Sequence, residues 1–212
     1  MTVSKRTLGI LGASGHGKVV AEVALAAGWE QVLFFDDAPD KTKIARWPVR
    51  GNQDVLIGLV QELGGVVVAI GNNSVRSRKL RQLQALGVPV VSLVHPAAVV
   101  SPSASLGSGT VVMAGVVVNA DAKVGQGSIL NTACTVDHDC VLGDAVHVSP
   151  GAHLAGGVHV GDSSWVGIGA VVRQGVNIGP RVVVGAGAAV VSDVTDGLTV
   201  VGVPAKPIRT TP

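Results

Sequence analysis

The residue most suited to chemistry in this sequence is His138, which stands between Asp137 and Asp139 in the segment VDHDCVLGD. A carboxylate beside an imidazole raises its basicity and fixes its tautomer, which suits proton removal near neutral pH. No Cys or Ser stands beside His138 as an activated nucleophile, so the pattern favours direct group transfer over a covalent intermediate. The alternative is a solvated histidine whose flanking acids form salt bridges.

A second candidate is the glycine-rich turn GASGHG at residues 12–17, which follows a short apolar segment. Backbone N–H groups in such a turn can approach phosphate oxygens at a helix N-terminus, where the helix dipole also favours negative charge. The glycine spacing differs from the dinucleotide fingerprint G-x-G-x-x-G, which argues against a nicotinamide cofactor. We therefore expect a mononucleotide ligand, and a tight turn without a ligand is the alternative.

Asp36 and Asp37 follow the next apolar segment, about one strand–helix–strand unit later. Carboxylates at this position commonly accept hydrogen bonds from ribose or sugar hydroxyls. We therefore predict that Asp36 and Asp37 face the same ligand as the glycine turn. Solvated acids are the alternative.

The elements that must position these residues alternate between strands and helices over the first part of the chain. We predict strands at 7–11, 31–35, 66–70 and 88–94 and helices at 19–27, 54–63 and 74–86. Strand, helix and strand in succession imply a parallel sheet with right-handed crossovers, whose strand ends converge on one crevice. Gly71 and Asn72 end the third predicted strand, and Arg76 lies in the helix that follows.

A strict repeat follows, in which an aliphatic residue returns every sixth position from Val100 to Val190, at sixteen positions without interruption. A period of six fits neither a helix nor a free strand and indicates a parallel β-helix of hexapeptide repeats. Three hexads close one triangular coil, so eighteen residues separate stacked positions, with coils about 4.8 Å apart. The residue eighteen positions after His138 is Gly156. Its backbone N–H is therefore a candidate donor to a developing oxyanion near His138, and the alternative is that Gly156 and Gly157 form only a permissive corner.

Composition bounds the function and the domain count. The 212 residues are 47% hydrophobic but only 2% aromatic, with 29 Gly, which suits a core of stacked small aliphatic side chains. We predict two domains, residues 1–95 and 96–212.

The net charge of +2 is too small to indicate nucleic-acid binding. No signal peptide or membrane span is indicated near the start of the chain, so we expect a cytoplasmic protein. Cys134 and Cys140 occupy inward corners and are expected to be free.

Taken together, the motifs GASGHGKVV, FFDD, AIGNNSVRSR, VDHDCVLGD and VVGVPAKPI around a hexapeptide repeat resemble the sugar-nucleotide amine N-acetyltransferases and the related sialic acid O-acetyltransferases. The likeness covers nearly the whole chain. It implies a Rossmann-like N-terminal domain followed by a left-handed β-helix, acetyl-CoA as cosubstrate and a homotrimer with acetyl-CoA bound between subunits. The implied acceptor is a nucleotide-linked amino sugar, with a UDP-linked 4-amino-4,6-dideoxy sugar favoured, although the residues select neither base nor sugar.

The resemblance also implies roles for individual residues. His138 would be the catalytic base, Asp139 its orienting partner and Gly156 the donor to the oxyanion. The residues implied for the sugar nucleotide are Gly12, Ser14, Gly15, His16, Gly17, Asp36, Asp37, Gly71, Asn72 and Arg76. The residues implied for acetyl-CoA are His147, Gly156, Arg173 and Lys206, with Arg181 as a further candidate for its phosphates. Apolar segments at 111–118 and 182–191 would form the contacts between subunits.

Three other functions stay open from the sequence. A sialic acid O-acetyltransferase would share the fold and the base, and no residue separates amine from hydroxyl acceptors. A zinc enzyme resembling the γ-class carbonic anhydrases would need histidines that converge on one ion, but His147, His153 and His159 share one hexad phase and therefore face three different sides of the prism. We therefore expect no metal within one chain. A non-catalytic interaction protein is the third alternative.

Overall fold

The computed structural model describes residues 6–208, which form two compact units, one up to Pro96 and one from Ala97 onwards. Each unit is described by itself below. Among residues 6–208, every helix is too short or too polar to span a lipid bilayer.

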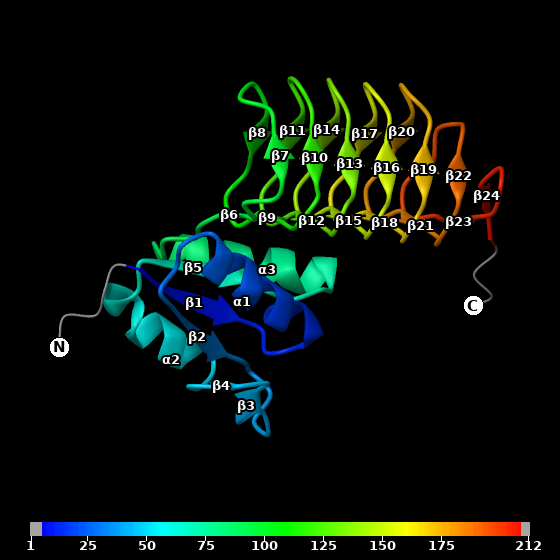
Figure 1. The fold of residues 1–212 in the computed structure, drawn as a ribbon. Coiled ribbons are helices and arrows are strands. Elements are labelled where there is room, and N and C mark those ends of the chain that lie inside the picture. Colours follow the sequence, from blue (N-terminus) through cyan, green and yellow to red (C-terminus); the bar gives the residue numbers. More distant parts are fainter. Residues whose placement is uncertain (1–5, 209–212) are drawn as a thin grey trace. The chain divides into compact units, whose positions relative to one another are not determined.

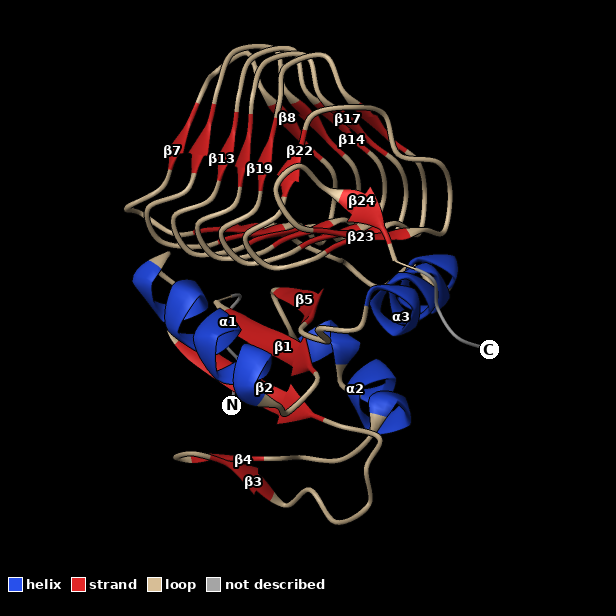
Figure 2. Cartoon of the chain, turned by 90° about the vertical axis from the view of Figure 1, so that its right-hand side faces the viewer, coloured by secondary structure: helices blue, strands red, loops and turns tan. Residues whose placement is uncertain are grey.

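The first unit contains a three-stranded parallel sheet in the order β2-β1-β5, made by Thr7–Leu11 (β1), Gln31–Phe35 (β2) and Gly65–Val68 (β5). Its helices are Gly15–Ala26 (α1), Gln53–Gly58 (α2) and Asn73–Ala85 (α3). Figure 2 shows α1 on one side of this sheet and α2 and α3 on the other. The α2 and α3 side of the core contains Leu11, Phe35, Leu56, Leu80 and Leu83. The predicted α/β fold with a parallel sheet is confirmed.

Several predicted boundaries in this unit were wrong. Helix α1 begins at Gly15 rather than residue 19, and α2 is followed by a short 3-10 helix, Val60–Glu62, in place of one continuous helix. The stretch 38–50 forms a small antiparallel hairpin of Lys43–Ile44 (β3) and Trp47–Pro48 (β4), which we had not predicted.

The predicted fourth strand, 88–94, contains only a single parallel bridge between Val66 and Val90 and the short β6, Leu93–Val94. Pro89 has no N–H to donate to a sheet, and this accounts for the broken pairing.

The second unit is a parallel β-helix whose short strands stack into three sheets (Figure 1). The first sheet contains β7 (Val99–Val100), β10 (Val117–Val118), β13 (Thr135–Val136), β16 (His153–Leu154), β19 (Val171–Val172) and β22 (Ala189–Val190). The second contains β8 (Ser105–Leu106), β11 (Lys123–Val124), β14 (Val141–Leu142), β17 (His159–Val160) and β20 (Asn177–Ile178). The third contains β9 (Val111–Val112), β12 (Ile129–Leu130), β15 (His147–Val148), β18 (Trp165–Val166), β21 (Val183–Val184), β23 (Thr199–Val201) and β24 (Lys206–Pro207).

The register between coils is eighteen residues throughout the regular repeat, as predicted. Val118 pairs with Val136 and Val136 pairs with Leu154, for example. From Val112 to Val190, the repeating aliphatic side chains are at most 4% exposed. The small residue four positions after each one is also buried, and Cys134 and Cys140 are two such residues, both free thiols. Stacked small aliphatic side chains therefore form the core, as the composition indicated.

Candidate active site

The His138 and Asp139 side chains form a hydrogen-bonded pair on the corner between the β13 and β14 faces. The Nδ1 atom of His138 lies 2.8 Å from Oδ2 of Asp139, and both side chains are mostly exposed. This hydrogen bond, together with the negative charges of Asp139 and Asp137, raises the pKa of His138 above its ordinary value. Since Nδ1–H donates to a carboxylate, the neutral ring carries its lone pair on Nε2. The pair can therefore accept a proton at Nε2.

Asp139 can contact the ring because the backbone turns at this residue. Its φ is +59°, in the left-handed region, as are the φ angles of Asp121 and Gly157 at the same place in neighbouring coils. Asp and Asn tolerate this conformation better than most residues. A regular strand would have directed residue 139 away from residue 138. The left-handed turn therefore brings the two side chains together.

Gly156 lies against the His138 ring, as the eighteen-residue register predicted. A Cβ atom added at Gly156 would come within 2.5 Å of both Cε1 and Nε2 of His138, so only glycine leaves room for the ring. The next residue, Gly157, donates its N–H to the His138 carbonyl oxygen at 2.9 Å. The Gly156 N–H itself makes no hydrogen bond to the described part of the chain. A free backbone donor therefore lies beside the proposed base.

The same donor position is occupied in two other coils. Asn131 Oδ1 accepts the N–H of Thr132 at 2.9 Å, and Asp137 Oδ1 accepts the N–H of His138 at 3.0 Å. In each case the side chain that precedes the turn caps the following N–H. Ala155 precedes Gly156 and has no side-chain acceptor. The Gly156 donor therefore stays uncapped.

The other histidines of the repeat lie on three different sheets, as predicted. His147 is on β15, His153 on β16 and His159 on β17. The ring of His153 contacts Thr135 Oγ1 at 3.0 Å, and that of His159 contacts the Gly157 carbonyl oxygen at 3.2 Å. Among residues 6–208, no three His, Cys, Asp or Glu side chains gather closely enough to ligate one metal ion.

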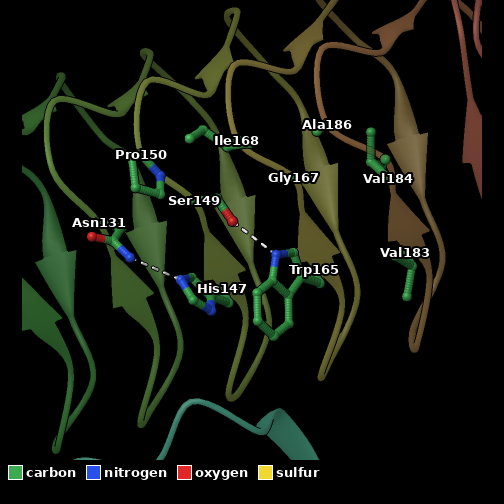
Figure 3. Close-up of a pocket in the computed structure, with 11 residues that line it drawn as sticks. Asn131, His147, Ser149, Pro150, Trp165, Gly167, Ile168, Val183, Val184 and Ala186 are labelled. Carbon is green, nitrogen blue, oxygen red and sulfur yellow. Dashed lines mark hydrogen bonds between the residues drawn. The ribbon is translucent and has the colours of Figure 1, made fainter. Parts of the chain in front are cut away.

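His147 lines a groove of about 450 Å³ on the β15 and β18 face (Figure 3). Its ring packs on the indole of Trp165 with the two centroids 4.3 Å apart, and Asn131 Nδ2 lies 3.1 Å from its Nε2. The Trp165 indole N–H donates to Ser149 Oγ at 2.8 Å. The β15 face lies opposite the corner of His138, so one chain does not bring His147 and His138 together. We predicted that His147 contacts acetyl-CoA, which the resemblance places between subunits, and this stays a prediction.

Two of the basic residues expected near acetyl-CoA lie at different places. Arg173 is exposed and stacks one coil after Ala155, because Leu154 pairs with Val172. Ala155 in turn stacks one coil after Asp137, so Arg173 belongs to the same corner. Lys206 lies on β24 at the C-terminal end of the β-helix. Arg173 is therefore the basic residue nearer the His138 corner.

The first unit contains a pocket of about 370 Å³ at the carboxyl ends of β1, β2 and β5. It is lined by Leu11, Gly12, Ser14, Asp36, Asp37, Ile70, Val75, Arg78 and Lys79. Helix α1 starts here without a side-chain cap, so its first N–H groups face this end of the sheet. A Cβ at Gly12 or Gly17 would collide with backbone, whereas one at Gly15 would meet nothing within 4 Å. Gly12 and Gly17 therefore shape the turn, and Gly15 leaves it open.

The two acids beside this pocket are already engaged. Asp36 accepts the N–H groups of Ala13 at 2.6 Å and Ala38 at 2.9 Å, and this fixes the glycine turn. Asp37 accepts the Gln53 N–H at 3.0 Å and forms a salt bridge with Lys79. Each carboxylate oxygen can still accept a further hydrogen bond from a ligand.

Arg76 does not line the pocket, contrary to our prediction. Its side chain is buried, and its guanidinium donates to the carbonyl oxygens of Ile70 and Gly71 and to Asn73 Oδ1. Burial lowers the pKa of Arg76 to about 10. The cations that do line the pocket, Arg78 and Lys79, were missed. The sequence held a signal for this, because Arg76 shares a helix face with the apolar Leu80 and Leu83.

The remaining predicted ligand residues lie beside the pocket. Gly71 and Asn72 follow β5, and Asn72 caps α3 by accepting the Val75 N–H at 3.0 Å. His16 lies in the first turn of α1 with a buried Nε2 atom. Burial, followed by the charge of Arg76, lowers the pKa of His16 to about 4, so the ring is neutral near pH 7.

The chain is similar to several known proteins. Residues 7–83 match the family described as the PglD N-terminal domain. UDP-N-acetylbacillosamine N-acetyltransferase of Bacillus subtilis (strain 168) is 37% identical in an alignment of length 118 that covers 51% of this chain. The match spans about half of that curated relative, 52% of its length.

Several solved structures match nearly the whole chain. The acetyltransferase domain of PglB from Neisseria gonorrhoeae FA1090 is 45% identical with a TM-score of 0.91, over 96% of this chain and 100% of that one. The same domain has been solved in complex with acetyl coenzyme A. PerB from Caulobacter crescentus, in complex with CoA and GDP-perosamine, is 43% identical with a TM-score of 0.91, over 96% of this chain and 97% of that one.

Proposed function

This chain belongs to the family of hexapeptide-repeat sugar-nucleotide N-acetyltransferases, and from that membership we propose that it transfers the acetyl group of acetyl-CoA to the amino group of a nucleotide-linked amino sugar. The acceptor we propose is a UDP-linked 4-amino-4,6-dideoxy sugar. The name of the Bacillus subtilis relative supports UDP as the nucleotide. The complex of PerB with GDP-perosamine makes GDP the nucleotide to compare with it.

The observation that carries this proposal is the contact between His138 and Gly156. The sugar amine attacks the thioester carbonyl carbon, a C–N bond forms, and the C–S bond to CoA breaks. Nε2 of His138 takes the proton that the amine loses, while Asp139 holds the opposite side of the ring. No covalent intermediate with the enzyme is needed, and the rate gain comes largely from holding the two reactants together.

The Gly156 N–H is the proposed donor to the oxygen of the attacked carbonyl. It lies beside the His138 ring and is uncapped within the described chain, so it can bind negative charge as that charge develops. Ala155 is the reason that it stays available.

Acetyl-CoA is proposed to run from this corner toward the C-terminal coils, with Arg173 as the first cation that its phosphates meet and Lys206 as a second. His147 and its groove lie on another face of the same chain. A homotrimer, as proposed from the sequence, would let the groove of one copy adjoin the His138 corner of the next.

Of the two segments first expected to make such contacts, 182–191 presents exposed apolar side chains, whereas 111–118 is largely buried within the chain. Val111 and its neighbours at 111–113 are buried, whereas Ile168, Val171, Val183 and Val191 are each at least 40% exposed. The proposal therefore places the later coils in the subunit contact. Light scattering should give three times the chain mass, and a monomer at micromolar concentration would contradict it.

In the first unit, the sugar nucleotide is proposed to occupy the pocket beside the glycine turn. The uncapped start of α1 and the side chains of Arg78 and Lys79 offer N–H donors and positive charge to a diphosphate. Asp36 and Asp37 remain candidates for the ribose or sugar hydroxyls.

The test follows CoA release from acetyl-CoA with UDP-linked and GDP-linked 4-amino-4,6-dideoxy sugars and with sialic acid as acceptors. We expect turnover with an amino sugar nucleotide. Turnover with sialic acid alone would replace the proposal by O-acetylation, and no turnover together with no acetyl-CoA binding would favour an interaction protein.

A substitution at Ala155 tests the oxyanion donor. Ala155→Asn should cap the Gly156 N–H as Asn131 caps Thr132, and lower kcat by about 10²-fold, the usual loss for one such donor. Ala155→Val adds bulk without an acceptor and serves as the matched control. Equal losses in the two variants would remove the Gly156 N–H from the mechanism.

A further inference from the structure

Asp137 does not contact the His138 ring, but it holds the His138 backbone. Its Oδ1 atom accepts the His138 N–H at 3.0 Å and also the side-chain amide of Asn119 at 2.7 Å. Asn119 lies one coil below Asp137, because Val118 pairs with Val136. One carboxylate oxygen therefore links the coil below to the residue that carries the proposed base.

The backbone of His138 is held from the coil above as well. Its carbonyl oxygen accepts the N–H of Gly157 at 2.9 Å, and Gly156 leaves only enough space for the ring. Asp139 fixes the ring through Nδ1 but sits on the corner with its side chain largely exposed. Without Asp137, the His138 N–H would have no side-chain acceptor, and it would then be uncapped like the Gly156 N–H. The turn that aims the ring at Gly156 would then lose its side-chain link to the lower coil and keep the backbone hydrogen bond from the Asp139 N–H to the Ala120 carbonyl oxygen, at 3.0 Å.

We propose that Asn119 and Asp137 are positioning residues that hold the His138 turn against Gly156 and thereby set the geometry of proton transfer. This inference rests on the proposed function, since it assigns the pair a role in the same site. The amide of Asn119 is suited to this role because it donates to a carboxylate, whereas a second carboxylate there would repel Asp137.

The charges around His138 determine what the substitutions should do to its titration. Asp137 and Asp139 lie on its own turn, and their carboxylates raise its pKa. Asp121 lies in the coil below, two residues after Asn119, and the coil above presents Gly156, Gly157 and the ring of His159. Arg173 lies one coil further on. Replacing Asp137 by Asn removes one nearby negative charge and lowers the pKa of His138.

Three variants separate the charge of Asp137 from its hydrogen bond. Asp137→Asn keeps an oxygen for the His138 N–H, so its kcat should stay within about threefold of wild type at pH 8 while the acidic limb of its kcat/KM profile moves to lower pH. Asp137→Ala removes the acceptor and should lower kcat about tenfold, with both KM values within about twofold. Asn119→Ala should lower kcat by a smaller factor in the same direction and does not alter the residues next to His138.

Asp144→Ala is the matched control. Its Oδ1 also accepts a hydrogen bond from the coil below, from the Gln126 backbone N–H at 2.8 Å, but at the corner between the β14 and β15 faces. This variant should keep wild-type kcat. Wild-type kcat in Asp137→Ala and Asn119→Ala, or an equal loss in Asp144→Ala, would overturn the proposal. If Asp137→Ala does not fold, Asn119→Ala and Asp137→Asn decide it.

A titration by NMR keeps this inference separate from the proposed function. The His138 ring signal is assigned by comparison with His138→Gln, and its pKa is followed in wild type, Asp137→Asn and Asp144→Ala. We expect a lower His138 pKa in Asp137→Asn alone. An unchanged pKa in that variant would show that the Asp137 carboxylate does not lie at the His138 turn, which removes the premise of the positioning pair even in an active enzyme, whereas an inactive wild type with the expected shift would remove only the proposed function.

Discussion

The substitution Gly156→Ala tests the central contact of the proposed site. The added Cβ would lie 2.5 Å from both Cε1 and Nε2 of His138, whereas ordinary van der Waals contact begins at 3.4 Å. The ring would therefore have to retreat by about 1 Å, and a misplacement of about 1 Å in a reacting group can cost about 10²-fold in rate. The His138 side chain is 62% exposed, so it can swing away without disturbing the core. We therefore expect kcat to fall about 10²-fold while the melting temperature changes little.

The double variant His138→Ala/Gly156→Ala shows whether the loss passes through the ring. With the imidazole already removed, the methyl group at position 156 has nothing to displace, so the double variant should match His138→Ala in kcat. The backbone at position 156 still supplies its N–H after the substitution, which keeps the oxyanion donor in both backgrounds. Steady-state kcat and KM for all four proteins, with melting curves, give the cycle. Wild-type turnover in Gly156→Ala, or a full additional loss in the double variant, would refute the reasoning.

Three further predictions concern single side chains. Asp139→Gly keeps the left-handed turn at φ +59°, so the melting temperature should stay unchanged while kcat falls about 10²-fold. A fall in both kcat and the melting temperature would instead indicate a structural role for Asp139. The pKa of His16 is lowered to about 4 in the folded chain, so between about pH 6.5 and 4 the unfolded chain binds a proton that the folded chain does not. The free energy of unfolding should therefore fall by about 2 kcal/mol between pH 7.5 and 5, as measured by thermal unfolding. The variant His16→Asn should largely abolish this pH dependence. Lys79→Met removes a cation from the pocket of the first unit and should raise the KM of the sugar nucleotide about tenfold with the KM of acetyl-CoA unchanged, whereas equal changes in both would contradict the pocket assignment.

The two units differ in how far local sequence determined them. In the β-helix, one aliphatic residue in six fixed the coil length, the register and the burial of each corner, since every hexad repeats the same turn. In the first unit, the apolar runs located β1 and β2 to the residue. The prediction of a strand at 88–94 was wrong because the apolar, β-branched pattern there is typical of a strand, although Pro89 interrupts the hydrogen bonds that a strand needs. The hairpin at 43–48 had no apolar alternation to mark it.

Residue spacing is enough to place the site along the β-helix axis. A constant period places residue 156 directly over residue 138 whatever the side chains are, so the contact between Gly156 and His138 followed from counting. The direction of each side chain, around that axis and in the first unit, is visible only in the folded chain. The left-handed φ of Asp139 turned it toward the ring and left Asp137 on the backbone, while packing against the sheet buried Arg76 and left Lys79 in the pocket. These directions depend on backbone turns and on neighbours distant in sequence, which residue spacing alone does not contain.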